Sequence, residues 1–183
     1  LSKLGIPAAL VFSPILASVY GGKASAGIII IPVIVSDLIV MYLYRKDVEK
    51  KVLFKILPLT VLGIIVAVIF GNNISDEIFK KSMGIIILII GTLTLLKSLK
   101  IDFSKLSFLF GFLGGIAAFI GNVSGPMMSI YLLNIKMDRD KFYGTRTWFY
   151  FIVNIIKATL YVLVLNNIHL ETFKLTSVAI PFV

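Results

Sequence analysis

The sequence predicts an all-α, polytopic membrane protein that forms one transmembrane domain over residues 1–183. The chain is 58% hydrophobic and 15% charged, with a mean hydropathy of +1.02, whereas an ordinary soluble domain carries roughly 25% charged residues. Several apolar runs approach the roughly 20 residues that a helix needs to span a bilayer. Runs such as 28–34 and 84–90 are apolar on every side, whereas the surface helix of a soluble protein has a polar face.

Eight apolar segments are expected to form the helices. They cover about residues 5–20, 24–44, 52–70, 75–96, 106–120, 125–135 and 147–165, and an eighth begins near Phe173. The turn residues Gly71-Asn72-Asn73 are expected to end the third segment, and the acids of Ser75-Asp76-Glu77 favour a helix start for the fourth. Since the chain begins at Leu1 and ends at Val183 within an apolar run, we expect it to be truncated at both ends.

The positive charge of the chain is expected to set its orientation in the membrane. The net charge is +9, and the loops after the second, fourth and sixth segments carry five, three and four Lys or Arg residues, against four on the other side. By the positive-inside rule these three loops are cytoplasmic, so the charge does not indicate a nucleic-acid partner.

The chain has no cysteine, which excludes disulfides and thiolate chemistry. Its single His169 lies in a polar loop, and no metal or cofactor is expected.

A polar break, residues 121–126, interrupts the apolar stretch from Leu106 to Leu133. Lipid cannot hydrogen-bond a loose backbone, so a break at membrane depth has to lie inside protein or line a wet cavity. Discontinuous helices of this kind hold the substrate in many secondary transporters. The segments on either side of the break form either two passes of a hairpin or one broken crossing, and the charge count favours the hairpin.

A shorter segment that resembles the break, residues 2–7, lies at the start of the chain and suggests an internal repeat. A shift of 117 positions places Gly27 on Gly144, Asp37 on Asn154 and Tyr44 on Tyr161. The loop charges put the two halves in opposite orientations, so we expect inverted repeats with broken helices near the midplane. Residues 1–100 would form the first repeat without its start, and residues 101–183 the second repeat without its end.

The strongest candidate site residues are one lysine and one aspartate that lie inside apolar runs. Lys157 lies ten positions into the seventh segment, and the i, i+3 spacing puts Asn154 on the same helix face. A charge at mid-membrane costs roughly 2.5–3.5 kcal/mol on insertion scales and by default indicates function. An ammonium beside an amide suits a small oxyanion. Asp37 is the only acid within an apolar run, and it is the candidate for coupling transport to protons.

The break supplies the other candidate substrate-binding residues. A helix N-terminus holds anions through exposed N–H groups and its dipole, and Asn122 and Ser124 add side-chain donors. Gly125 lets a ligand approach the backbone closely. In the first break, Lys3 offers a second positive charge, and Gly5 is the counterpart of Gly125.

Each functional interpretation of these residues has a structural alternative. Lys157 could snorkel or pair with Asp37, which would keep that aspartate in a fixed ion pair. The break could be a kink for packing, with Asn122 or Ser124 as a cap. Several residues are expected to have structural roles alone: Thr145 as the N-cap of the seventh helix, Trp148, Tyr143 and Tyr150 as an interfacial aromatic belt, Phe149 and Phe151 as packing or lipid-facing groups, and Gly111, Gly114 and Gly115 as close helix contacts.

Two stretches of the second half resemble the TauE/SafE sulfite exporter family. They are 121–133, GNVSGPMMSIYLL, and its continuation from Phe142 through Arg146 and Trp148 to Asn154 and Lys157. The opening residues 2–7 are similar to the first-repeat signature of the same family. The resemblance implies a membrane protein of bacteria, archaea or plants that transports small sulfur-containing anions such as sulfite or sulfoacetate. A full member would have more residues on both sides.

Taken together, the sequence predicts a secondary transporter, an exporter, of small anions. No nucleotide-binding P-loop is present in this sequence, so a proton gradient or the membrane potential is expected to drive transport. The expected partners are the anion and the lipid bilayer of a prokaryotic plasma membrane, which the chain crosses several times. The sequence leaves open whether the protein forms a homo-oligomer. The alternatives are an intramembrane enzyme, which needs a nucleophile and a base or a His and acid cluster, and a channel-like or structural subunit.

Overall fold

The computed structural model describes residues 8–44, 46–96, 107–122, 124–135 and 137–164, and in this part the chain is helical without any strand. The helices are α1 (Ala8–Tyr20), α2 (Gly22–Tyr44), α3 (Lys50–Asn73), α4 (Asp76–Leu96), α5 (Ser107–Gly121), α6 (Ser124–Asn134) and α7 (Arg139–Leu163). The all-α prediction is therefore confirmed. Two of these helices, α2 with 23 residues and α3 with 24, are long and apolar enough to cross a membrane. The start of the first predicted segment, the eighth segment and His169 lie outside the described residues.

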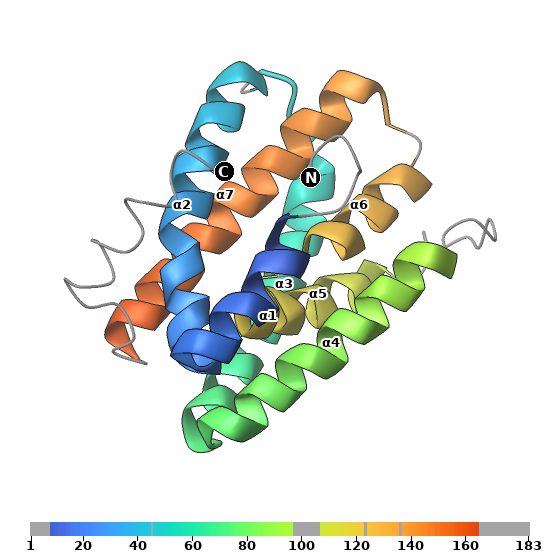
Figure 1. Ribbon diagram of the computed structural model, residues 1–183. Helices are drawn as coiled ribbons and strands as arrows, with labels where there is room; N and C mark the ends of the chain where they lie inside the picture. Colours follow the sequence, from blue (N-terminus) through green and yellow to red (C-terminus); the bar gives the residue numbers. More distant parts are fainter. Residues whose placement is uncertain (1–7, 45, 97–106, 123, 136, 165–183) are drawn as a thin grey trace.

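The helices connect at two opposite ends of the molecule (Figure 1). At the first, which we name the basic end, residues 46–49 and 137–138 link α2 to α3 and α6 to α7; the Glu49 N–H donates to Thr145 Oγ1 at 2.8 Å. Lys141 Nζ also lies 3.4 Å from Glu49 Oε2. At the opposite end, the Asp76 carboxylate accepts the N–H groups of Gly22 and Lys23 at 2.9 and 2.8 Å. Two loops that the charge count assigned to one side thus meet at one end.

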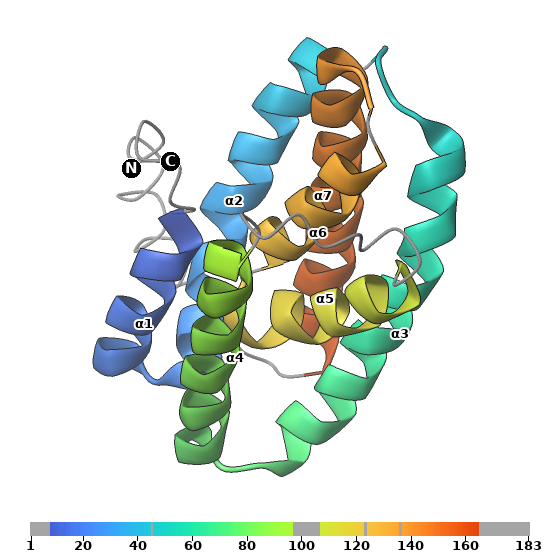
Figure 2. The same ribbon diagram turned by 90° about the vertical axis from the view of Figure 1, so that its right-hand side faces the viewer.

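The α2 and α7 helices pack against each other in opposite directions. In Figure 1, α2 rises toward the basic end and α7 descends from it. Figure 2 shows α5 lying across the molecule, at a large angle to both. With 15 residues in α5 and 11 in α6, these helices are roughly 22 and 16 Å long. Each is shorter than the roughly 30 Å hydrocarbon core of a bilayer, so neither could cross it alone.

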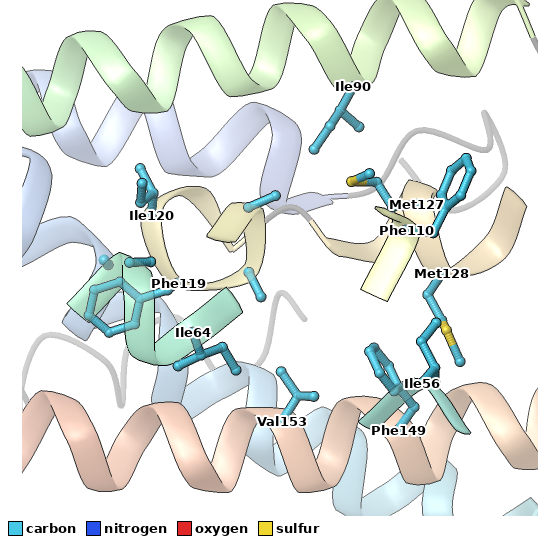
Figure 3. Close-up of a cluster of buried hydrophobic side chains, with 14 of the residues drawn as sticks. Ile56, Ile64, Ile90, Phe110, Phe119, Ile120, Met127, Met128, Phe149 and Val153 are labelled. Atoms are coloured by element: carbon cyan, nitrogen blue, oxygen red, sulfur yellow. The ribbon is translucent and has the colours of Figure 1, made fainter. Parts of the chain in front are cut away.

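All seven described helices contribute side chains to one apolar core, part of which Figure 3 shows. Phe119 of α5 and Ile64 of α3 are fully enclosed, and Val153 of α7 and Leu132 of α6 are equally buried. In lipid, burial of apolar side chains supplies little net drive for helix association, because the lipid tails are as apolar as the core. Close backbone packing therefore has to hold the helices together.

Glycines provide that close packing between α3 and α5, which share the most extensive helix contact. A Cβ added at Gly115 would collide with the Thr60 carbonyl group, and one at Gly63 with the carbonyl group of Phe112. Gly111 is similarly tight, since its Cβ would lie 2.8 Å from Leu59 Cβ. The predicted packing role is confirmed for Gly111 and Gly115. It is wrong for Gly114, where a Cβ would meet nothing within 4 Å.

We expect Gly115→Ala to destabilise the protein by about 1–3 kcal/mol, the usual cost of overpacking a close contact. Gly114→Ala adds the same methyl group one residue away, where it meets open space, and should leave stability unchanged or slightly higher because alanine favours helices. Thermal unfolding of both variants in detergent micelles measures the difference. Equal unfolding temperatures for the two variants would contradict the assigned α3–α5 contact.

Two helix boundaries differ from the sequence-based expectation. Helix α7 begins at Arg139, not near Thr147, because its first two turns are polar and lie outside the apolar run. Thr145 therefore lies within the helix and is not its N-cap. Helix α3 continues through Asn73, whose side-chain N–H donates to the Ile69 carbonyl oxygen at 2.7 Å. The helix start at Ser75 is confirmed, since its Oγ accepts the N–H of Ile78 at 3.3 Å.

Candidate functional site

The polar break begins with a residue in a left-handed conformation. Asn122 has a φ of 54°, a region that most side chains avoid and that asparagine tolerates. Its N–H donates to the Ala118 carbonyl oxygen at 3.1 Å, which closes the last turn of α5. Helix α6 starts at Ser124, and Pro126 in its first turn needs no N–H partner. The backbone of Asn122 therefore ends α5, whichever role its side chain has.

Side chains from other helices satisfy the loose carbonyl groups of the break. Ser13 Oγ of α1 donates to the Gly121 carbonyl oxygen at 2.9 Å, and the Tyr161 hydroxyl of α7 donates to the carbonyl oxygen of Phe119. The Tyr150 hydroxyl, also on α7, donates to the Gly125 carbonyl oxygen at 2.8 Å. Hydrogen bonds from α1 and α7 thus hold the backbone on both sides of the break, as an irregular backbone inside a membrane would require.

The side chains of Asp37, Asn122, Asn154 and Lys157, which we name the polar cluster, form a continuous chain of hydrogen bonds. The Lys157 ammonium donates to the Oδ1 atoms of Asn122 and Asn154, at 3.2 Å in the second case. Asn154 Nδ2 donates to Asp37 Oδ2 at 2.7 Å. Asn122 Nδ2 donates to the Ala26 carbonyl oxygen at 3.3 Å. The structure therefore joins α2, α7 and the break through four candidate residues.

The polar cluster keeps the Lys157 amino group away from water. Lys157 is 1% exposed and Asn154 is 7% exposed, while Asp37 and Asn122 are half-buried. The lysine does not snorkel to a surface. In the described part of the chain, Lys157 and Asp37 do not form a direct ion pair, because the Asn154 amide lies between them.

The structure describes the remaining candidate site residues only in part. Gly125 is half-buried in α6, and an added Cβ there would meet only the Tyr150 hydroxyl oxygen, at 3.7 Å. Helix packing therefore does not require a glycine at this position. Ser124 is the first residue of α6, and its side chain lies outside the described set. Lys3 and Gly5 of the first break also lie outside the described residues.

Sequence reasoning missed the hydroxyl groups that support the break. Tyr150 was expected only as a member of an interfacial aromatic belt, but its hydroxyl donates to the Gly125 carbonyl oxygen at the break. A helical wheel could have identified it, because positions 150, 154 and 157 share one face of α7. Ser13 carried no local signal, since its partner is 108 positions away. Phe149, at 2% exposure, packs in the core.

The cluster is suited to binding an anion. A buried ammonium offers three N–H donors, and the start of α6 adds a positive dipole end.

A shallow apolar hollow lies along the last turns of α7, lined by Ala158, Thr159, Val162 and Leu163. It shares no residue with the polar cluster.

Comparison with known proteins identifies one family. The family model described as sulfite exporter TauE/SafE matches residues 2–183. No curated protein and no solved structure gives a significant match.

Proposed function

Because the chain belongs to the sulfite exporter TauE/SafE family, we propose that it is a secondary transporter of a small sulfur-containing anion in a cell membrane. Membership implies a membrane transporter of sulfite or related sulfur anions. The observation that carries the proposal for this chain is the buried Lys157, held by two amides beside the break. The proposed direction is export, and the proposed substrates are sulfite and small organosulfonates.

The proposed binding residues are Lys157, Asn154, Asn122, Ser124 and Gly125. The two amide oxygens account for two of the three ammonium donors, which leaves the third for an oxyanion. The N–H groups at the start of α6 would bind the same ligand, and the lack of close packing around Gly125 is consistent with an approach to its backbone. Lys3 and Gly5 remain proposed contributions from the first break.

We assign the coupling role to Asp37. Its carboxylate is the negative end of the polar cluster, so it competes with an incoming anion for the field of Lys157. Protonation of Asp37 would remove that competition, so that anion binding at Lys157 would depend on the protonation state of Asp37. This arrangement links binding of the two ions through one short chain of hydrogen bonds.

Several observations support inverted repeats. The residues that the shift of 117 superimposes, Asp37 and Asn154, are hydrogen-bonded to each other, as expected for equivalent residues that meet at a two-fold axis. The same shift places α2 (Gly22–Tyr44) on the first 23 residues of α7, and these helices run in opposite directions (Figure 1). We therefore propose that α1 and α2 are the inverted equivalents of α6 and α7, within repeats at 1–100 and 101–183.

The closed state of the cluster favours a transporter over a channel-like subunit. Lys157 is 1% exposed, and an anion could reach it only after a conformational change. A secondary transporter exposes such a site to each side in turn by moving one repeat against the other. Family membership likewise favours transport over an intramembrane enzyme.

Flux measurements on the purified protein in proteoliposomes test the proposed function. Sulfite, a small sulfonate, sulfate and chloride are offered separately, with and without a pH gradient. We expect sulfite or the sulfonate to move faster than sulfate and chloride, and empty liposomes provide the background. If none of the four anions moves above that background, the transporter proposal fails.

The topology can be tested with single cysteines, because the native chain contains none. Asp140 at the basic end and Asn72 near the opposite end are both exposed. We expect a membrane-impermeant maleimide to label Asp140→Cys only from the cytoplasmic side and Asn72→Cys only from the other side. Labelling of both cysteines from the same side would contradict the proposed arrangement of the helices in the membrane.

A further inference from the structure

A stripe of polar side chains runs along α7 from the basic end to the polar cluster. It consists of Arg146, Tyr150, Asn154 and Lys157, at positions i, i+4, i+8 and i+11. Eleven residues make about three turns of an α-helix, so all four share one face and the stripe is roughly 16 Å long. The proposed function uses only the last two residues of this stripe.

Arg146, at the start of the stripe, is half-buried and has an unsatisfied donor. Its Nε atom is buried and has no hydrogen-bond partner among the described residues. The guanidinium carbon lies 5.4 Å from the centre of the Tyr150 ring, which fixes the side chain by a cation–π contact. The Tyr150 hydroxyl in turn binds the Gly125 carbonyl oxygen at the break. Arg146 is therefore held in place while a donor lacks an acceptor.

A buried N–H group without an acceptor is costly, so native proteins rarely retain one without a reason. The acceptor that suits a guanidinium best is an oxyanion, which it binds through two parallel N–H groups. Asp37 contacts the same stripe, because its Oδ2 accepts a hydrogen bond from Asn154 Nδ2 at 2.7 Å. The stripe thus has a cation near each end and, at Asn154 between them, a hydrogen bond to a carboxylate.

From this arrangement we propose that Arg146 is a second anion-binding position, which receives the transported oxyanion from the basic end before it reaches Lys157. The inference rests on the proposed function and extends it by one residue. Asp37, which accepts a hydrogen bond from Asn154 between the two cations, supplies negative charge to the stripe when no anion is bound. The unsatisfied Nε of Arg146 is the donor that the bound oxyanion would occupy.

The test compares Arg146→Gln with Arg146→Lys in vesicles of defined orientation. The KM for sulfite, or for the anion that wild type moves fastest, is measured separately from each face. We expect Arg146→Gln to raise the KM from the basic face about 10- to 100-fold, the range for hydrogen bonds to a charged group, with the KM from the opposite face unchanged. Arg146→Lys keeps the positive charge but loses the two parallel N–H donors of the guanidinium. Its KM from the basic face should therefore lie between those of wild type and Arg146→Gln.

The control is Arg139→Gln, since Arg139 is exposed at the same end and its guanidinium carbon lies 5.9 Å from the centre of the Tyr143 ring. This variant should keep the wild-type KM from both faces. Three results overturn the inference: a KM unchanged from the basic face, an equal rise from both faces, or the failure of both Arg146 variants to fold, since each would make Arg146 structural. If wild type moves no anion, the proposed function fails as well.

Discussion

Replacing Lys157 with methionine is expected to reduce anion flux at least about 30-fold. The substitution removes the amino group that two amides hold inside the protein, and loss of a buried ionic partner costs about 2–5 kcal/mol of binding. Because methionine has nearly the same length and no charge, the variant should fold and remain as thermally stable as wild type. Flux of sulfite or a small sulfonate into proteoliposomes measures the effect.

Two companion variants separate the anion site from the fold. Lys81→Met removes a lysine whose side chain is 70% exposed and pairs with Glu77, and it should transport normally. Asn122→Gly keeps a residue that tolerates the left-handed turn and removes only the amide that faces Lys157. We expect this glycine variant to fold and to transport poorly. Normal transport by Lys157→Met would refute the assignment of the anion site to the polar cluster.

Asp37→Asn is expected to uncouple transport from the proton gradient. The asparagine can still accept a hydrogen bond from Asn154 in place of Asp37 Oδ2, so the geometry of the cluster should survive. Accumulation driven by a pH gradient should fall about tenfold or more, within the usual range of coupling free energies. Exchange of labelled for unlabelled anion needs no proton and should continue, with tighter anion binding because a competing charge is gone.

The control for Asp37 is Asp140→Asn, at an exposed position near the basic end, which should behave like wild type in both assays. Measurement of accumulation and exchange on the same vesicles separates coupling from binding. If Asp37→Asn still accumulates the anion in response to a pH gradient, Asp37 is not the proton carrier. Its role in the polar cluster would then be limited to holding Asn154 in place.

Asn122 shows how one residue can serve the fold and the proposed site together. Its backbone adopts the left-handed turn that ends α5, while its amide binds both Lys157 and the Ala26 carbonyl oxygen. The two explanations that the sequence leaves open, a cap and a ligand-binding residue, are therefore compatible. A site built on a helix cap is positioned by the end of a rigid element rather than by a free loop.

The sequence alone determined the class of the protein and most of its helices. Apolar runs of nearly bilayer length predict helices because every backbone group in lipid has to be satisfied within its own segment. The same argument identified the break and made Lys157 and Asp37 stand out, since a charge inside an apolar run is costly wherever it folds. The i, i+3 spacing was also enough to place Asn154 beside Lys157, because both lie on one helix.

Only the tertiary structure decided which distant groups meet. Ser13 reaches the Gly121 carbonyl oxygen across 108 positions, and Asp37 reaches Asn154 across 117; neither contact has a local pattern, because helix packing creates both. The structure also showed that the Tyr150 hydroxyl binds the break and that Arg146 Nε has no hydrogen-bond partner among the described residues. Periodicity fixes which residues share a face of one helix, but the partner of that face depends on close approach at sites such as Gly115.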